Sequence, residues 1–268
     1  MTRLTEADVT TLTRELGTFE ARLLEATGLD LRGLALRAAG MEDCCVQLRG
    51  ARIAAVPMTA GDGVITGFTD CVVAVLLHLG CDAWASTQPD VRGIQAAVAA
   101  GAGVLFLADD HRFIALNVTR GCSVDDDPAT ADGYVAALEA AAGGLGGREV
   151  LLLGLGPVGR AAARRLIAKG ASVLVVEPDE ERVVAAQEVG LEVKAVELAA
   201  GLSRCALVVD ASPAAAIINT DDLLPGTIAA VPGLPSAFTP AAQAALGARH
   251  IHEPLAIGVA VMAVRAVL

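Results

Sequence analysis

Residues 149–177, EVLLLGLGPVGRAAARRLIAKGASVLVVE, restrict the possible folds of this chain more than any other segment. The apolar run at 150–153 is followed at once by a glycine-rich turn at 154–159, and then by an Ala- and Leu-rich helical pattern that ends at Gly170. A second apolar run follows at 172–176. A buried strand, a turn, a helix and another strand make one βαβ unit, which joins parallel strands by a right-handed crossover. This segment predicts an open α/β sheet.

The three glycines of this turn have the spacing Gly-x-Gly-x-x-Gly, which suits a dinucleotide. Gly154 permits the tight turn, Gly156 lets the backbone approach a pyrophosphate, and Gly159 lets the helix pack closely on the strand. The amides and the dipole at the start of the helix attract an anion. The alternative is a glycine-rich turn in another kind of α/β unit, but the strand, helix and second strand all lie where a dinucleotide needs them. We therefore predict a doubly wound Rossmann domain whose cofactor-binding turn is Gly154, Leu155, Gly156, Pro157, Val158 and Gly159.

An acidic residue, Glu177, ends the second strand of this unit and is followed by Pro178. A carboxylate at this position can accept hydrogen bonds from both hydroxyls of an adenosine ribose, and its charge repels the additional phosphate of NADP. We therefore predict that the cofactor is NAD, with Glu177 and Pro178 at its adenosine end.

Two further strands in this half end in loops that suit the nicotinamide end of the cofactor. The apolar strand at 205–209 leads into the loop 211–213, where a helix does not continue easily across a Ser-Pro pair. The loop 231–233 is rigid and offers backbone amides and carbonyls. Ligands of parallel sheets collect at the carboxyl ends of the strands. The predicted contacts are Ala211, Ser212, Pro213, Val231, Pro232 and Gly233.

The first half of the chain has a second α/β pattern. Strands alternate with helices from residue 52, which predicts a parallel sheet with helical crossovers. Residues 4–27 and 30–39 have helical periodicity and form an arm that packs on its own domain or on a second subunit. The C-terminal helix after Pro254 is apolar on nearly every side and must be buried at a domain or subunit interface. We predict an arm and α/β substrate domain at 1–145, the Rossmann domain at 146–250, with the glycine-rich joint 143–147 between them, and the C-terminal helix at 251–268.

Two adjacent carboxylates, Asp109 and Asp110, directly follow a buried strand of the first half. Such charges are unfavourable unless they are hydrated, paired or met by a cationic ligand, and an amine substrate would satisfy them. The alternative is that one of them caps the following turn and that His111 is merely solvated. The acids at 125–127 are expected in an exposed loop ahead of a helix at 131–142.

Charge and composition exclude several classes of protein. The net charge of −11 and the lack of a basic cluster argue against a nucleic-acid partner. The six cysteines include the pair Cys44 and Cys45 but no Cys-x-x-Cys, so we expect reduced thiols and no metal site. No apolar run is long enough to span a membrane and the start has no signal-peptide pattern. We expect a soluble cytoplasmic protein that forms a homodimer and binds a small molecule.

Several segments together resemble the family of 3-methylornithyl-N6-lysine dehydrogenases, which complete pyrrolysine biosynthesis. They are LTEAD and TGLD near the start, VPMTAGDGVITGF, DDHRF, GLGPVG, DASPA, PGLP and HEPLAIG. These segments span nearly the whole chain, and their order and spacing are more specific than any one of them. One departure is Ala60, where we expect a serine in archaeal relatives, so a polar contact from that position would be missing here.

The resemblance implies NAD-dependent oxidation of an amine. The substrate would be lysine whose side-chain nitrogen is acylated by 3-methyl-D-ornithine. Hydride loss from the carbon that bears the terminal amine, loss of ammonia to water, and ring closure by the ornithine α-amine would give pyrrolysine. Independently, amine oxidation requires a neutral amine, and a nearby carboxylate can bind the ammonium and help to remove its proton. We predict Asp109 as the first choice for this role and Asp110 as the second, with a substrate site at Thr59, Ala60, Thr66 and Phe68.

Two other classes of function stay open at this point. One is another NAD-dependent amine or hydroxy-acid dehydrogenase of the shikimate or amino-acid dehydrogenase architecture. Those enzymes use a catalytic lysine in the substrate domain, whereas residues 1–147 contain no lysine. The other is a non-catalytic NAD-sensing module, which has no need of a carboxylate facing the nicotinamide.

Overall fold

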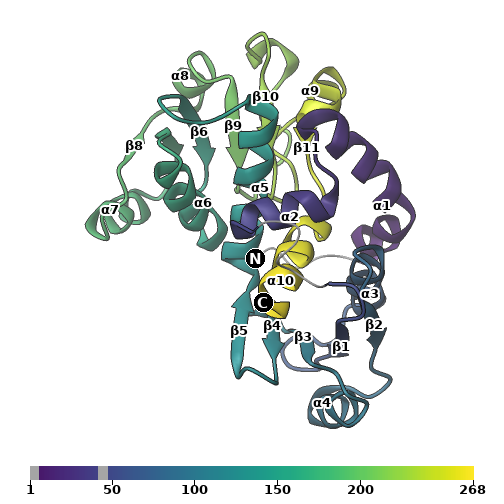
Figure 1. The fold of residues 1–268 in the computed structure, drawn as a ribbon. Helices are drawn as coiled ribbons and strands as arrows, with labels where there is room; N and C mark the ends of the chain where they lie inside the picture. Colours follow the sequence, from purple (N-terminus) through teal and green to yellow (C-terminus); the bar gives the residue numbers. More distant parts are fainter. Residues whose placement is uncertain (1–5, 42–47) are drawn as a thin grey trace.

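The computed structural model describes residues 6–41 and 48–268, and Cys44 and Cys45 lie outside the described residues. Two β-sheets stand at opposite ends of the molecule, with helices on and between them (Figure 1). The first sheet is built from residues 52–125 and the second from residues 149–251. Among the described residues, no helix is long and apolar enough to cross a membrane.

The first sheet has five strands in the order β2-β1-β3-β4-β5, and it is mixed. Its parallel part is as predicted: β1 (Arg52–Pro57) pairs with β2 (Asp82–Ala85) and with β3 (Val104–Ala108). The prediction did not include β4 (Phe113–Asn117) and β5 (Cys122–Asp125), which continue the sheet as antiparallel strands and make it mixed. The connection 109–112 is too short for a helical crossover, so the chain must turn back as a hairpin.

Helices cover this sheet and support its carboxyl edge. The crossover helices are α3 (Phe68–His78), which follows β1, and α4 (Asp90–Ala99), which follows β2. The N-terminal arm consists of α1 (Glu6–Thr27), which packs on α3 and α5, and α2 (Leu31–Ala39), which packs on α5 and α10. In this structure the arm therefore packs on its own chain.

The second sheet is parallel and has six strands in the order β11-β10-β9-β6-β7-β8. Apolar side chains of its central strands are buried on both faces, which explains the near-continuous apolar runs in the sequence. Its strands are β6 (Glu149–Leu153), β7 (Ser172–Val176), β8 (Val193–Ala195), β9 (Leu207–Asp210), β10 (Ile228–Ala230) and β11 (His250–Ile251). Its helices are α6 (Pro157–Ala168), α7 (Glu180–Glu188), α8 (Leu198–Leu202), α9 (Pro240–Leu246) and the short turns η2 (Thr220–Asp222) and η3 (Gly247–Arg249).

Two helices, α5 (Asp126–Ala142) and α10 (Ala256–Val267), join the two halves (Figure 1). α5 packs on α6 and on strands β9 and β10, while α10 packs on α5, α2, α3, β4 and β5. Close approach of the two helices needs glycine: a Cβ added to Gly133 of α5 would be 2.4 Å from Ile257 Cγ2 of α10. The C-terminal helix is thus buried, as predicted, and it is buried within the chain.

The start of α5 differs from the prediction of an exposed acidic loop. Asp125 ends β5 and caps the helix, where its side chain accepts a hydrogen bond from the Asp127 amide. Asp126 is already helical and only 8% exposed. The helix therefore begins five residues before the predicted residue 131, because a capping aspartate, two acids and Pro128 in the first turn are favourable at a helix N-terminus.

Candidate functional site

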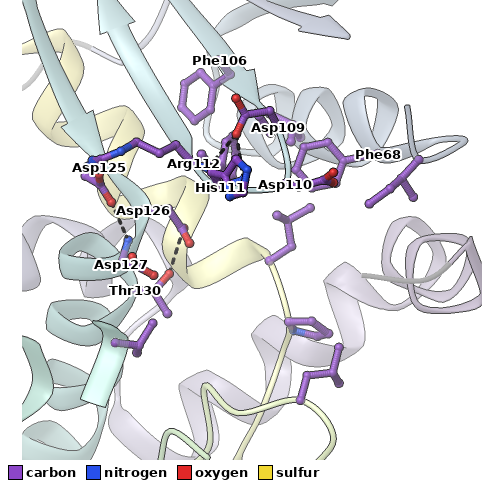
Figure 2. Close-up of a pocket in the computed structure, with 18 of the residues that line it drawn as sticks. Phe68, Phe106, Asp109, Asp110, His111, Arg112, Asp125, Asp126, Asp127 and Thr130 are labelled. Atoms are coloured by element: carbon purple, nitrogen blue, oxygen red, sulfur yellow. Dashed lines mark hydrogen bonds and ion pairs between the residues drawn. The ribbon is translucent and has the colours of Figure 1, made fainter. Parts of the chain in front are cut away.

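A cleft of about 330 Å³ lies where the carboxyl edges of the two sheets face each other. Its walls come from the ends of β1 and β3, the start of α5, the glycine turn before α6 and the loops after β9 and β10. Figure 2 shows the turn of Asp109 to Arg112 and the segment of Asp125 to Asp127 on neighbouring sides of this space. The cleft therefore brings the predicted substrate loops and the predicted cofactor loops together.

The glycine turn has the shape that a dinucleotide needs. Gly154 has φ +85°, and a Cβ there would be 2.9 Å from the Ala211 carbonyl oxygen. A Cβ on Gly159 would be 2.1 Å from the Gly154 carbonyl oxygen, so helix α6 can approach the strand only with glycine at this position. A Cβ on Gly156 would meet no described atom within 4 Å. The turn is open on the side where a pyrophosphate would approach the start of α6.

Glu177 supports this turn from the end of β7. Its side chain is only 4% exposed. One oxygen accepts a hydrogen bond from the Leu155 amide at 2.7 Å, and the other accepts one from the Asp179 amide at 3.2 Å. Each carboxylate oxygen has two lone pairs, so both can accept a further hydrogen bond. Glu177 is thus held beside the turn with acceptor capacity left for a ribose.

Buried Asp210 ties together the two loops at the other end of the cofactor site. Its Oδ1 accepts from the Ser212 hydroxyl at 2.7 Å, and its Oδ2 accepts from the Ala237 amide at 2.7 Å. Its carbonyl oxygen accepts from the Gly233 amide, also at 2.7 Å. Burial raises the pKa of this carboxyl, although the hydrogen bonds oppose the shift. Asp210 is a loop-positioning group that the sequence reading did not single out.

Asp109 and Asp110 both line the cleft but are held differently. Asp109 Oδ1 accepts from the amides of His111 and Arg112, each at 2.8 Å, and these bonds lower the pKa of Asp109. Asp109 therefore caps the β3–β4 turn, which was the alternative role, and stays ionised at neutral pH. Asp110 accepts from the Asp62 amide at 2.5 Å and lies where a Cβ on Gly61 would stand. It fixes the loop that follows β1.

A second acidic group lines the cleft at the start of α5, and the sequence reading missed it. Asp125 pairs with Arg112 at 2.7 Å. Asp126 accepts from the Thr130 hydroxyl at 2.9 Å, and burial raises its pKa from 3.8 to about 7. Burial also raises the pKa of Asp127, whose buried Oδ1 accepts no hydrogen bond from the described residues. The signal in the sequence was the run of three acids before a proline, which is typical of a helix start.

The cleft also has an apolar wall. It consists of Met58, Val64, Ile65, Phe68, Val72, Phe106 and Phe113. Phe68 and Phe113 meet edge to face at 5.4 Å between ring centroids. The polar lining of the cleft is acidic, because it contains five aspartates and, as basic side chains, Arg112 and His111. A ligand with an aliphatic body and ammonium groups therefore suits both the apolar and the polar lining.

The predicted site residues are only partly brought together. Those that line the cleft are Asp109, Asp110, Phe68, Gly156, Pro157, Val158, Ala211, Ser212, Pro213, Pro232 and Gly233. The other predicted site residues do not line the cleft, and they are Thr59, Ala60, Thr66, Gly154, Leu155, Gly159, Glu177, Pro178 and Val231. Thr59 is the clearest departure, because its hydroxyl donates to Asp90 Oδ2 at 2.5 Å and its amide bonds Oδ1 of the same residue.

The chain is similar to known proteins over nearly its whole length. The family described as "Pyrrolysine biosynthesis protein PylD, N-terminal domain" matches residues 8–124, and the "TrkA-N domain" matches residues 150–218. The protein named pyrrolysine synthase from Methanosarcina acetivorans is 30% identical over 265 residues, which cover 98% of each chain. The chain belongs to the PylD family. The pyrrolysine synthase of Methanosarcina barkeri, another relative in this family, is 29% identical over 98% of this chain and 97% of its own.

Solved structures show that this PylD-family chain has the fold of a known group of dehydrogenases. Quinate dehydrogenase from Corynebacterium glutamicum, solved with NAD, has a TM-score of 0.54 and 18% identity and covers 82% of this chain and 94% of its own. Shikimate 5-dehydrogenase from Thermus thermophilus has a TM-score of 0.52 and 17% identity and covers 80% and 92%. At this identity the likeness establishes the fold, including a dinucleotide-binding type of domain.

Proposed function

We propose that the protein is a pyrrolysine synthase, which oxidises the terminal amine of lysine acylated on its side-chain nitrogen by 3-methyl-D-ornithine. The observation that carries the proposal is that acidic side chains and an open glycine turn line the same cleft. The full-length homology to pyrrolysine synthases supports the same reaction. We further propose the division into domains at 1–145, 146–250 and 251–268, although β11 (His250–Ile251) crosses the second boundary.

In this proposal the two sides of the cleft bind the two parts of the substrate. The apolar wall around Phe68 takes the aliphatic chains. Asp109 and Asp110 attract the ammonium groups, because an acidic, partly desolvated cleft favours cations. Loss of hydride from the carbon beside the terminal amine, hydrolysis of the imine and attack by the ornithine α-amine then give the pyrroline ring.

The proposed cofactor is NAD. When bound, it supplies the acceptor for the hydride. Gly156 and the start of α6 would hold its pyrophosphate, Glu177 its adenosine ribose, and the loops 211–213 and 231–233 its nicotinamide end. The close glycine contacts described above are those that such a ligand requires, so the residues present fit the cofactor.

The proposed function is tested by incubating the purified protein with NAD and lysine-Nε-3-methyl-D-ornithine. We expect NADH to form together with ammonia and a cyclic imine of the mass of pyrrolysine. Lysine-Nε-D-ornithine, without the methyl group, should also react, because an apolar pocket gains only about 1 to 3 kcal/mol from one methyl. Reduction of NAD by shikimate or by simple amino acids, with no reaction of the ornithyl-lysines, would instead favour another dehydrogenase.

A separate prediction concerns the choice between NAD and NADP. We expect the unaltered protein to prefer NAD, because the 2′-phosphate of NADP would lie against the Glu177 carboxylate. Glu177→Ser should lower the ratio of kcat/KM for NAD to kcat/KM for NADP by about tenfold or more. A tenfold change corresponds to roughly 1.4 kcal/mol of lost repulsion. The measurement is kcat/KM for each cofactor.

Glu177→Gln is the matched control, because it keeps an oxygen for the Leu155 amide while it removes the charge and the second acceptor oxygen, which bonds the Asp179 amide. A preference narrowed by Ser but not by Gln would mean that support of the turn, and not charge, selects the cofactor. Equal kcat/KM for NAD and NADP in the unaltered protein would refute the role of Glu177.

A further inference from the structure

We infer that Asp126 is the group that accepts the proton of the reacting amine. This inference rests on the proposed function and names a residue for its chemical step. Asp126 is the first residue of α5 and lines the cleft together with Gly156 and Val158 of the cofactor turn. It therefore belongs to the space that both substrate and cofactor must enter, although it is only 8% exposed.

Packing holds the Asp126 carboxylate in one place. Thr130, one turn further along α5, donates its hydroxyl to Asp126 Oδ1 at 2.9 Å (Figure 2). Gly258 of α10 lies against this pair, since a Cβ there would be 2.3 Å from Thr130 Oγ1 and 2.6 Å from Asp126 Oδ1. Only glycine at position 258 lets α10 close over the pair. The carboxyl is thus positioned before any substrate binds, which a proton acceptor requires.

Among the described residues, the charged side chains that act directly on Asp126 are acidic. The titratable and charged groups that face it or its neighbours are Asp125, Asp127, Tyr134, Glu253, Arg112 and Arg160. Arg112 forms an ion pair with Asp125. The positive charges of Arg112 and Arg160 act on Asp127. Burial is the main cause that raises the pKa of Asp126 to about 7, and the like charges of Asp127 and Asp125 add to it.

Asp126 and Asp109 are suited to different tasks. The backbone amides that lower the pKa of Asp109 keep it a carboxylate, which can hold an ammonium but is a weak base. A carboxyl whose pKa lies near the working pH exchanges a proton far more readily. When two carboxyls in one site have pKa values shifted in opposite directions, the one with the lowered pKa serves as a fixed negative charge. The one with the raised pKa serves as the acid–base group.

The proton and the electrons balance in this step. Asp126 takes one proton from the substrate –NH3⁺, which leaves a neutral amine with a free electron pair. The adjacent carbon gives up a hydride, with both electrons of its C–H bond, to the bound nicotinamide dinucleotide. Carbon and nitrogen then share the amine electron pair as an iminium ion. Water adds to this ion and its nitrogen leaves as ammonium, which carries the positive charge and gives the aldehyde for ring closure.

The test compares Asp126→Asn and Thr130→Val with the unaltered protein over a range of pH. Asp126→Asn should lower kcat by about 100-fold or more and abolish the rise of kcat/KM with pH near neutrality. Thr130→Val should move that rise to higher pH, because the lost hydrogen bond favoured the charged form. Asp30→Asn, at a capping aspartate outside the cleft, should change neither quantity.

A second measurement uses the protein without substrate or cofactor. The infrared spectrum should contain protonated-carboxyl absorption that titrates near pH 7. Asp126→Asn should lose part of this absorption, and the rest belongs to Glu253, whose pKa burial also raises to about 7. Because the folded-state pKa is raised from 3.8 to about 7, this group lowers stability as pH rises through that window. Asp126→Asn should therefore melt at least as high as the unaltered protein at pH 8.

The outcomes separate this inference from the proposed function. If the unaltered protein forms NADH from ornithyl-lysine and Asp126→Asn keeps its kcat and pH profile, the inference is wrong and the function stands. If Asp126→Asn is inactive but also unfolded at pH 8, the residue is structural and the inference is again wrong. If the unaltered protein forms no NADH from any ornithyl-lysine, both are overturned.

Discussion

A chain that ends at Glu253 should fail to fold. It would lack α10, ten of whose twelve residues are buried. Ile257, Val259, Val261, Met262 and Val264 are each 0% exposed. Full burial of a side chain of this size contributes roughly 1.5 to 3 kcal/mol, so these five contribute about 8 to 15 kcal/mol. That is as large as the whole stability of an ordinary domain, about 5 to 15 kcal/mol.

The expected result is an insoluble protein, or one without a cooperative melting transition. The loss should be more than local, because α10 packs on both the first sheet and α5, which in turn packs on the second sheet. The control lacks only Leu268, which leaves every residue of α10 in place. A soluble chain ending at Glu253 with a normal melting temperature would show that α10 is an accessory to the fold.

The Rossmann sheet was predictable because its signals are local. Its central strands β6, β7, β9 and β10 are short apolar runs bounded by glycine or a polar turn, and the order of strand and helix decides the topology. The two-residue edge strand β11, His-Ile, has no such signal and was not predicted. The hairpin of β4 and β5 was missed for the opposite reason. Its strands contain exposed as well as buried positions, and their direction is decided by connections of only a few residues.

Most of the loops that line the cleft were predictable, since the carboxyl ends of parallel strands meet at one edge of a sheet. The sequence did not reveal which carboxylates are buried. Three successive acids at 125–127 resemble a solvated surface, and Asp126 is buried by packing against Gly258, far away in the chain. Likewise the sequence did not reveal that the Thr59 hydroxyl bonds Asp90, and its role as a substrate contact stays a prediction. Burial by distant elements is a tertiary property that local patterns do not contain.

Asp109→Asn should weaken substrate binding without disturbing the fold. The variant keeps Oδ1 as the acceptor for the His111 and Arg112 amides, so the turn survives and only the charge is lost. A hydrogen bond between charged groups contributes about 1.5 to 3 kcal/mol, so kcat/KM should fall by roughly 10- to 100-fold, mainly through KM. The measurement is steady-state NADH production over a range of substrate concentrations, beside a titration with NAD that should be unchanged.

Asp110→Asn is the matched comparison, because it makes the same change at the neighbouring carboxylate. Asp110 fixes the loop after β1 through the Asp62 amide, and an asparagine oxygen can accept that bond, so we expect the smaller effect. A large rise in KM for Asp110→Asn alone would reverse the assignment. A fall in kcat for Asp109→Asn, with loss of the rise of activity near pH 7, would mean that Asp109 takes the proton. An unchanged pH profile is the result expected of a carboxylate that only holds the ammonium, because its own titration lies well below neutrality.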